Sequence, residues 1–240
     1  MRAAMDNLQL LGGNYRPITN TLGFLECSAE RAAQTFWEWR DKTYSRNGRI
    51  LRIERVTTDG LAAMLELLLP LRTWEDRWLF VETNSAWCAF VENGFRGVDL
   101  GPMISLGRYR CQCRSIRATS IPSGMPAAGY PACIFEVVMP TPDEAGNIQR
   151  SVCAMDDGGR WIFETTGTPY SFEITERYDA PLKRDRFTHE MLVDYLRHFG
   201  IDAFDEAFYR SNDGCTAYLV HIEGPPLPGN EEHPLSLQRG

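Results

Sequence analysis

The feature that most constrains the fold is the segment 74–99, WEDRWLFVETNSAWCAFVENGFRGVD, which has the pattern of two strands around a tight turn. Asn84 and Ser85 are residue types that favour turns, and a two-residue loop there fixes which residues face each other. Apolar, aromatic and opposite-charge side chains then fall opposite one another, as they do in stable hairpins. The expected pairs are Thr83 with Ala86, Arg77 with Glu92, Trp78 with Val91 and Leu79 with Phe90.

Both faces of this expected hairpin are apolar. Side chains alternate along a strand, so Trp78 and Phe80 lie on one face and Leu79 and Val81 on the other. Strands that are apolar on both sides are typically covered on both faces. The pattern therefore predicts a central hairpin between two packing layers, with its tryptophans in the core.

The rest of the chain mixes helix and strand patterns. Ser28, Asp59 and Thr188 are predicted helix caps, because apolar residues at helical spacing follow each of them. A second hairpin, 148–155 with 160–165, is predicted around a turn of two aspartates and two glycines. Further strands are expected at 22–27, 49–56, 115–121, 133–139, 172–175 and 215–222, and short helices at 103–108 and 203–208. The predicted fold class is α+β, a mostly antiparallel sheet of hairpins with three to four packed helices.

Four parts are expected along the chain. Residues 1–20 have the composition of a flexible N-terminal arm, and residues 21–140 are expected to form an α+β subdomain. After a loop at 140–147, residues 148–223 are expected to form a second α+β subdomain, and the proline-rich residues 224–240 an irregular tail. The Arg-Trp-apolar-Phe order at 160–163 repeats that at 77–80, so two related subdomains and two unrelated ones both stay open.

Composition excludes several classes. With 43% apolar and 11% aromatic residues, the chain has enough apolar side chains for a substantial core, which excludes disorder. No apolar run is long enough to cross a bilayer, and the first residues lack the pattern of a secretion signal. We therefore expect a cytoplasmic protein without a membrane partner.

The cysteines lie mostly in apolar, strand-like runs, where a thiol acts as a small hydrophobic side chain. Cys111 and Cys113 are the only close pair, and alternation along a strand would point both thiols the same way. A zinc site needs further ligands, and the sequence has no second pair or neighbouring histidine there. Free thiols, no metal and no cofactor are expected. The seven cysteines are Cys27, Cys88, Cys111, Cys113, Cys133, Cys153 and Cys215.

The formal net charge is -7, which argues against nucleic-acid binding because that requires clustered Lys and Arg. Arg49, Arg52 and Arg55 are expected to form a solvated or ion-paired strand edge. Residues 201–240 carry seven acids against two arginines. A solvated surface is the simpler explanation of these acids, and a docking face for a basic partner is the alternative.

No nucleophile elbow, phosphate loop, dinucleotide fingerprint, metalloprotease helix or calcium loop is found. His189 and His198 lie nine residues apart, which is the wrong spacing for a shared metal on a helix. A histidine-based triad would have to be assembled by the fold from distant segments. Glu164 and Glu173 lie among aromatic residues, where burial would raise the pKa of either carboxyl.

The motifs Trp78-Leu79-Phe80 and Trp87-Cys88-Ala89-Phe90, the segment 156–163 and a late capped helix resemble those of bacterial proteins of uncharacterised families. Some of these are similar to immunity proteins that neutralise toxins delivered between competing bacteria. The resemblance implies a non-enzymatic binding protein that neutralises a cognate toxin by direct binding. On charge complementarity, the expected partner-binding residues are Asp202, Asp205, Glu206, Asp213 and Glu223.

Two alternatives to the immunity function stay open. The first is a hydrolase or transferase with a carboxylate site built from residues such as Glu82, Glu92 or Glu164. The second is a small-ligand-binding regulatory domain in which tryptophans form the pocket wall. The sequence leaves the oligomeric state open.

Overall fold

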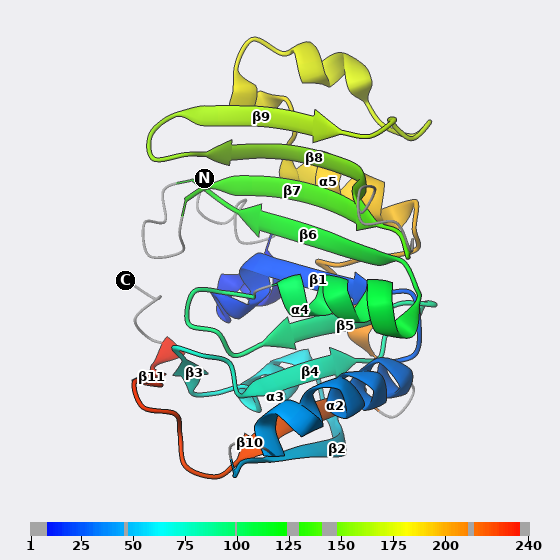
Figure 1. Cartoon of the computed structure of the whole chain (residues 1–240). Coiled ribbons are helices and arrows are strands. Elements are labelled where there is room, and N and C mark those ends of the chain that lie inside the picture. Colours follow the sequence, from blue (N-terminus) through cyan, green and yellow to red (C-terminus); the bar gives the residue numbers. More distant parts are fainter. Residues whose placement is uncertain are drawn as a thin grey trace.

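The computed structural model describes residues 9–45, 48–98, 100–123, 130–140, 148–210 and 214–235. It has an α+β fold, as the sequence predicts, built on a nine-stranded antiparallel sheet with helices on both faces (Figure 1). The strand order is β2-β10-β4-β5-β1-β6-β7-β8-β9, and β11 and β3 form a separate two-stranded sheet. The expected central hairpin is therefore inside the large sheet, as β4 and β5.

The described elements have the following bounds. The strands are β1 (Thr21–Leu25), β2 (Ile50–Thr58), β3 (Leu71–Arg72), β4 (Arg77–Val81), β5 (Cys88–Glu92), β6 (Ser115–Ile121), β7 (Ala132–Val138), β8 (Ile148–Asp156), β9 (Trp161–Thr166), β10 (Cys215–Glu223) and β11 (Glu232–His233). The helices are α2 (Ala29–Ser45), α3 (Leu61–Glu66), α4 (Leu100–Ser105), which continues as a π-helix (Leu106–Cys111), and α5 (His189–Arg197). Short 3-10 segments are Leu10–Gly13, Ile18–Asn20, Thr175–Asp179, Lys183–Asp185 and Glu206–Tyr209.

One face of the sheet is covered by α2 and α4 (Figure 1). The apolar stripe of α2 is buried as predicted, with Phe36 at its centre. The Phe36 ring lies 5.2 Å from that of Trp78 and 5.5 Å from that of Phe80, measured between centroids. This confirms that Trp78 and Phe80 share one face of the hairpin and pack against a helix.

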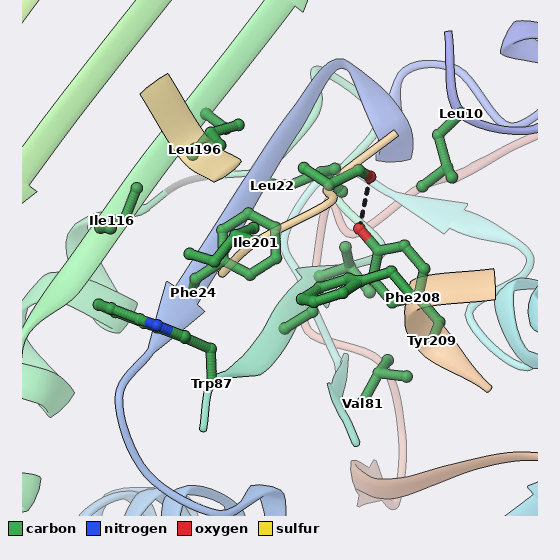
Figure 2. Packing of buried hydrophobic residues seen from close by; sticks show 14 of the residues in the cluster. Leu10, Leu22, Phe24, Val81, Trp87, Ile116, Leu196, Ile201, Phe208 and Tyr209 are labelled. Atoms are coloured by element: carbon green, nitrogen blue, oxygen red, sulfur yellow. Dashed lines mark hydrogen bonds between the residues drawn. The ribbon is translucent and has the colours of Figure 1, made fainter. Parts of the chain in front are cut away.

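The opposite face carries the larger core, to which α3, α5 and the 3-10 segments contribute (Figure 2). Leu79 and Val81 of the hairpin belong to this second cluster, as their alternation predicts. Tyr209 is buried here, and its hydroxyl donates a hydrogen bond to the carbonyl of Ala203 at 2.7 Å. Both faces of the sheet are therefore packed.

The predicted register of the central hairpin is wrong by one residue. Trp78 lies opposite Glu92, Leu79 opposite Val91, and Phe80 opposite Phe90. Directly opposite residues share a face, so this register places Phe80 and Phe90 together under α2. Seven residues separate the paired Val81 and Ala89, an odd number, whereas a two-residue loop requires an even one. The hydroxyl of Thr83 donates to the carbonyl of Trp87, and the hydroxyl of Ser85 accepts from the amide of Trp87 at 3.2 Å, so the turn is centred on Ser85.

The predicted caps have mixed outcomes. Thr188 accepts a hydrogen bond from the amide of Met191 at 3.5 Å, and Ser28 accepts one from the amide of Arg31 at 3.3 Å. The predicted cap at Asp59 is wrong, since α3 begins at Leu61 with Gly60 in the cap position. The expected strand at 172–175 is also wrong, because this segment contains a turn and the start of a 3-10 helix. The hairpin of β8 and β9 is confirmed.

The two expected subdomains contribute strands to the same nine-stranded sheet. β10, from the expected second subdomain, lies between β2 and β4 of the first, and most of the 140–147 loop is outside the described residues. In the expected arm, residues 9–20 are packed rather than loose, with Leu10 and Ile18 buried in the core. In the expected irregular tail, β11 pairs with β3. An internal repeat stays a prediction.

Candidate functional site

Five acidic residues are expected to bind a partner, and the structure brings only some of them together. Asp202 and Asp205 both line two open cavities of about 370 Å³ each beside α5. Asp202 accepts a hydrogen bond from Nε of Arg197 at 2.7 Å, and Asp205 caps the following 3-10 segment through the amide of Ala207.

The other acidic residues do not extend this surface as one patch. Glu206 is exposed and follows Asp205 directly, and Asp213 is outside the described residues. Glu223 is the last residue of β10, where it pairs with Arg52 at 3.0 Å. At about 3.3 Å per residue, the strand places Glu223 roughly 26 Å from Cys215 at its start. Glu223 therefore belongs to a different end of the sheet from the residues beside α5.

The acids considered for a carboxylate-based enzyme do not share a site. Glu82 follows β4 at the loop end of the hairpin, whereas Glu92 is buried at the far end of β5. Glu164 is exposed on β9, at the edge of the sheet. Glu173 is buried, but the expected rise of its pKa is wrong: burial raises the pKa, and hydrogen bonds from Arg150, Tyr178 and an amide outweigh that effect and lower it.

The strongest candidate site is a cavity of about 230 Å³ between the C-terminal half of α2, the start of β2 and the two-stranded sheet. Trp74 and Trp78 line this cavity. Tryptophans in a pocket wall are what the alternative of a small-ligand-binding domain predicts. The polar side chains of the cavity come from four separate parts of the chain. The lining residues are Arg40, Tyr44, Arg49, Trp74, Glu75, Trp78, Pro102, Leu227 and Asn230.

Local structure explains how these groups meet. Phe36, Arg40 and Tyr44 follow one another at four-residue spacing on α2, so they lie on the same side of the helix, facing the sheet. Asn230 closes the cavity from the C-terminal side, because its side-chain oxygen accepts a hydrogen bond from the amide of Trp74 at 2.9 Å. The cavity thus depends on a contact between residues 156 positions apart in the sequence.

Arg49 is the most unusual residue of the cavity wall. Its side chain is nearly buried, with 6% of the residue exposed, and its Nε atom has no hydrogen-bond partner. Nε of Arg40 is buried without a partner as well. The guanidinium groups lie against rings: Arg49 is 5.6 Å from the Tyr44 centroid and Arg40 is 4.3 Å from that of Trp39. The sequence predicts a solvated or ion-paired edge, and the burial of Arg49 shows that this residue is not solvated.

The electrostatics of the cavity favour an anion. The cavity wall carries two guanidinium groups, those of Arg40 and Arg49, and one carboxylate, that of Glu75. Burial raises the pKa of Tyr44, and the positive charges of Arg40 and Arg49 oppose that rise. The Tyr44 hydroxyl is therefore protonated at neutral pH and able to donate a hydrogen bond. A buried N–H of a charged group without an acceptor is costly, so an anion that accepts from Nε of Arg49 or Arg40 would be stabilised in this cavity.

The cysteines of the described chain are all free. Sγ of Cys113 lies 3.9 Å from Sγ of Cys27, although residues 111–113 are not the expected strand: Cys111 ends the π-helix and Gln112 has a left-handed φ of 49°. Within the described ranges, no group of three or more His, Cys, Asp or Glu side chains is arranged to hold a metal ion.

Comparison with known proteins gives no assignment: no family model matches the chain, and no curated protein or solved structure matches it either. Among the described helices, none combines the length and the apolar character that a membrane span requires.

The sequence pattern places the tryptophans of 74–99 in the core and identifies none of them by number as a site residue. It predicts a solvated or ion-paired edge for Arg49 and gives no role to Arg40. The available signal was the four-residue spacing of Phe36, Arg40 and Tyr44, which places a cation and a hydroxyl next to a core phenylalanine.

Proposed function

We propose that this protein binds a small organic anion with an apolar portion, in the cavity between α2, β2 and the two-stranded sheet. The observation that supports this proposal best is the buried side chain of Arg49, which lines the cavity and whose Nε atom has no hydrogen-bond partner. A carboxylate or phosphate would accept from this Nε atom and from a neighbouring N–H, because a guanidinium binds both groups with paired hydrogen bonds.

The other lining residues define the ligand further. Arg40 adds a second positive charge, and the Tyr44 hydroxyl adds a donor. Trp74, Leu227 and Pro102 add apolar side chains to the cavity wall, which suits a flat or hydrophobic portion of the ligand. The volume of about 230 Å³ lies below the roughly 300–1,000 Å³ of pockets for drug-sized molecules, so the ligand is a small metabolite.

The test is a binding screen with benzoate, indole-3-acetate, short aliphatic carboxylates and inorganic phosphate, followed by tryptophan fluorescence and calorimetry. Arg49→Met removes the charge and keeps the apolar stem. It should weaken binding by about 10- to 100-fold, the effect of losing a hydrogen bond to a charged group. Arg52→Met is the matched control, because Arg52 is on the adjoining strand but is exposed and paired with Glu223. No binding to the wild type, or equal binding by Arg49→Met, would contradict the proposal.

Toxin neutralisation is a second candidate function. It is favoured by the arrangement of Glu190, Asp194, Asp202 and Asp205, four acids around one open cavity beside α5. Such a surface would accelerate association with a basic toxin domain. The experiment is co-purification with the product of the adjacent gene.

If a complex forms, Asp202→Asn with Asp205→Asn should reduce its association rate, and Asn preserves the cap at position 205. Glu223→Gln, at the other end of β10, should leave the rate unchanged. An adjacent product that is not a toxin and does not bind would remove this candidate.

A further inference from the structure

Ser120 and His189 form a pair that the proposed binding cavity does not involve. Ser120 lies near the end of β6, and His189 is the first residue of α5. Although they are 69 positions apart in the sequence, Oγ of Ser120 lies 2.8 Å from Nδ1 of His189. This is the distance of a direct hydrogen bond between a hydroxyl and an imidazole.

The pair lines a cavity of about 180 Å³ at the junction of β6, β7 and the start of α5. Trp161, Phe187 and Pro122 give this cavity an apolar wall, and Arg184 adds a positive charge. Ser120 itself is 5% exposed, so its hydroxyl is screened from bulk solvent. The cavity is large enough for a small acyl group and not for an extended chain.

The imidazole is in the form that can accept a proton. Burial lowers the pKa of His189, and the neighbouring Glu190 carboxylate opposes this only in part. His189 is therefore neutral at pH 7. With its proton on Nε2, Nδ1 is free to accept the hydrogen bond from Ser120 and then the proton itself, as a general base does.

We propose that Ser120 is a nucleophile activated by His189, and that it reacts with small esters of apolar carboxylic acids. Oγ of Ser120 forms a bond to the acyl carbon, and the hydroxyl proton passes to Nδ1 of His189. The bond from the acyl carbon to the alcohol oxygen breaks, and His189 gives the proton to the departing alcohol. A water molecule then gives a proton to Nδ1 of His189 and bonds to the acyl carbon. The bond from the acyl carbon to Oγ of Ser120 breaks, His189 returns the proton to Oγ, and the carboxylic acid leaves.

The wall of the cavity supports this substrate class. The apolar side chains favour an uncharged acyl group, and the positive charge of Arg184 favours the negative oxygen that develops on the tetrahedral intermediate. The same hydrogen bond would also fasten α5 to the sheet, so the test must measure covalent reactivity.

The experiment treats the full chain with a short alkyl fluorophosphonate and identifies the adduct by intact mass and peptide mapping. One adduct at Ser120 is expected, and Ser120→Ala should give none. His189→Gln should react at least about 100-fold more slowly, the usual contribution of a general base. Ser171→Ala is the matched control, since Ser171 is exposed and is not among the residues that line this cavity, and it should react like the wild type.

A thermal unfolding curve for each variant separates loss of reactivity from loss of fold. The mapping of the wild-type adduct needs no variant, so it decides the question even if His189→Gln does not fold. No adduct on the wild type, an adduct at another residue, or undiminished labelling of folded His189→Gln would overturn the proposal.

Discussion

The buried ion pair of Arg150 and Glu173 connects β8 to the segment after β9. Nε and Nη2 of Arg150 donate to the two carboxylate oxygens at 2.8 and 2.6 Å, and Nη1 donates to the carbonyls of Thr166 and Gly167 at 3.1 and 3.0 Å. The side chains are 1% and 0% exposed. Arg150→Met would remove all four hydrogen bonds and leave a buried carboxylate without its cation.

Breaking a buried pair on one side costs about 3–5 kcal/mol. The lower end is expected here, because the hydroxyl of Tyr178 and the amide of Tyr170 still donate to Glu173, at 2.7 and 2.9 Å. A loss of about 3 kcal/mol in the free energy of unfolding raises the unfolded fraction roughly 150-fold.

Urea denaturation followed by circular dichroism measures this loss. Arg52→Met is the control: it breaks a pair whose side chains are 52% and 48% exposed, and it should cost no more than about 1 kcal/mol. Adding Glu173→Gln to Arg150→Met should recover stability, because no charge then stays buried. A cost below about 1 kcal/mol for Arg150→Met would refute the reasoning.

Two further predictions concern acid stability and the core. Because the folded pKa of Glu173 lies below the usual 4.5, its carboxylate stabilises the fold above that pH, and the contribution is lost as the pH falls through the folded pKa. Glu173→Gln should therefore show a flatter decline of Tm below pH 4.5 than the wild type; an equal decline would show that other groups dominate. Phe36→Ala should cost about 3–5 kcal/mol in urea denaturation, since Phe36 is fully buried among aromatic rings, whereas Gln34→Ala on the exposed side of α2 should stay within about 0.5 kcal/mol.

The sequence predicts the features of this fold that depend on neighbouring residues. The faces of the central hairpin, the stripe of α2 and the cap at Thr188 all follow from short spacings, and the structure confirms them. The predicted register is wrong because the turn is centred on Ser85, held by hydrogen bonds among Thr83, Ser85 and Trp87, and not on the Asn84-Ser85 pair. The residue types alone do not distinguish these two turns.

The candidate site is predictable only in part for the same reason. The abundance of tryptophan suggests that tryptophans could form a pocket wall. The surroundings of Arg49 come from α2, from Trp74 and from the segment around Asn230, whose side chain is hydrogen-bonded to the amide of Trp74. An arginine at the end of a turn is ordinarily solvated, so the residues around Arg49 do not indicate that it is buried. The pairing of Ser120 with His189 likewise arises from the packing of α5 on the sheet.

The insertion of β10 between β2 and β4 has a consequence for the order in which the protein forms during synthesis. In the described sheet, β2 hydrogen-bonds to β10 and to no other strand. The first half of the sheet therefore cannot include β2 until residues 215–223 have been made, and pairings of such long sequence separation are slow to form. The cavity beside Arg49 also requires Leu227 and Asn230, which follow β10, so it cannot be complete until residue 230 has been made.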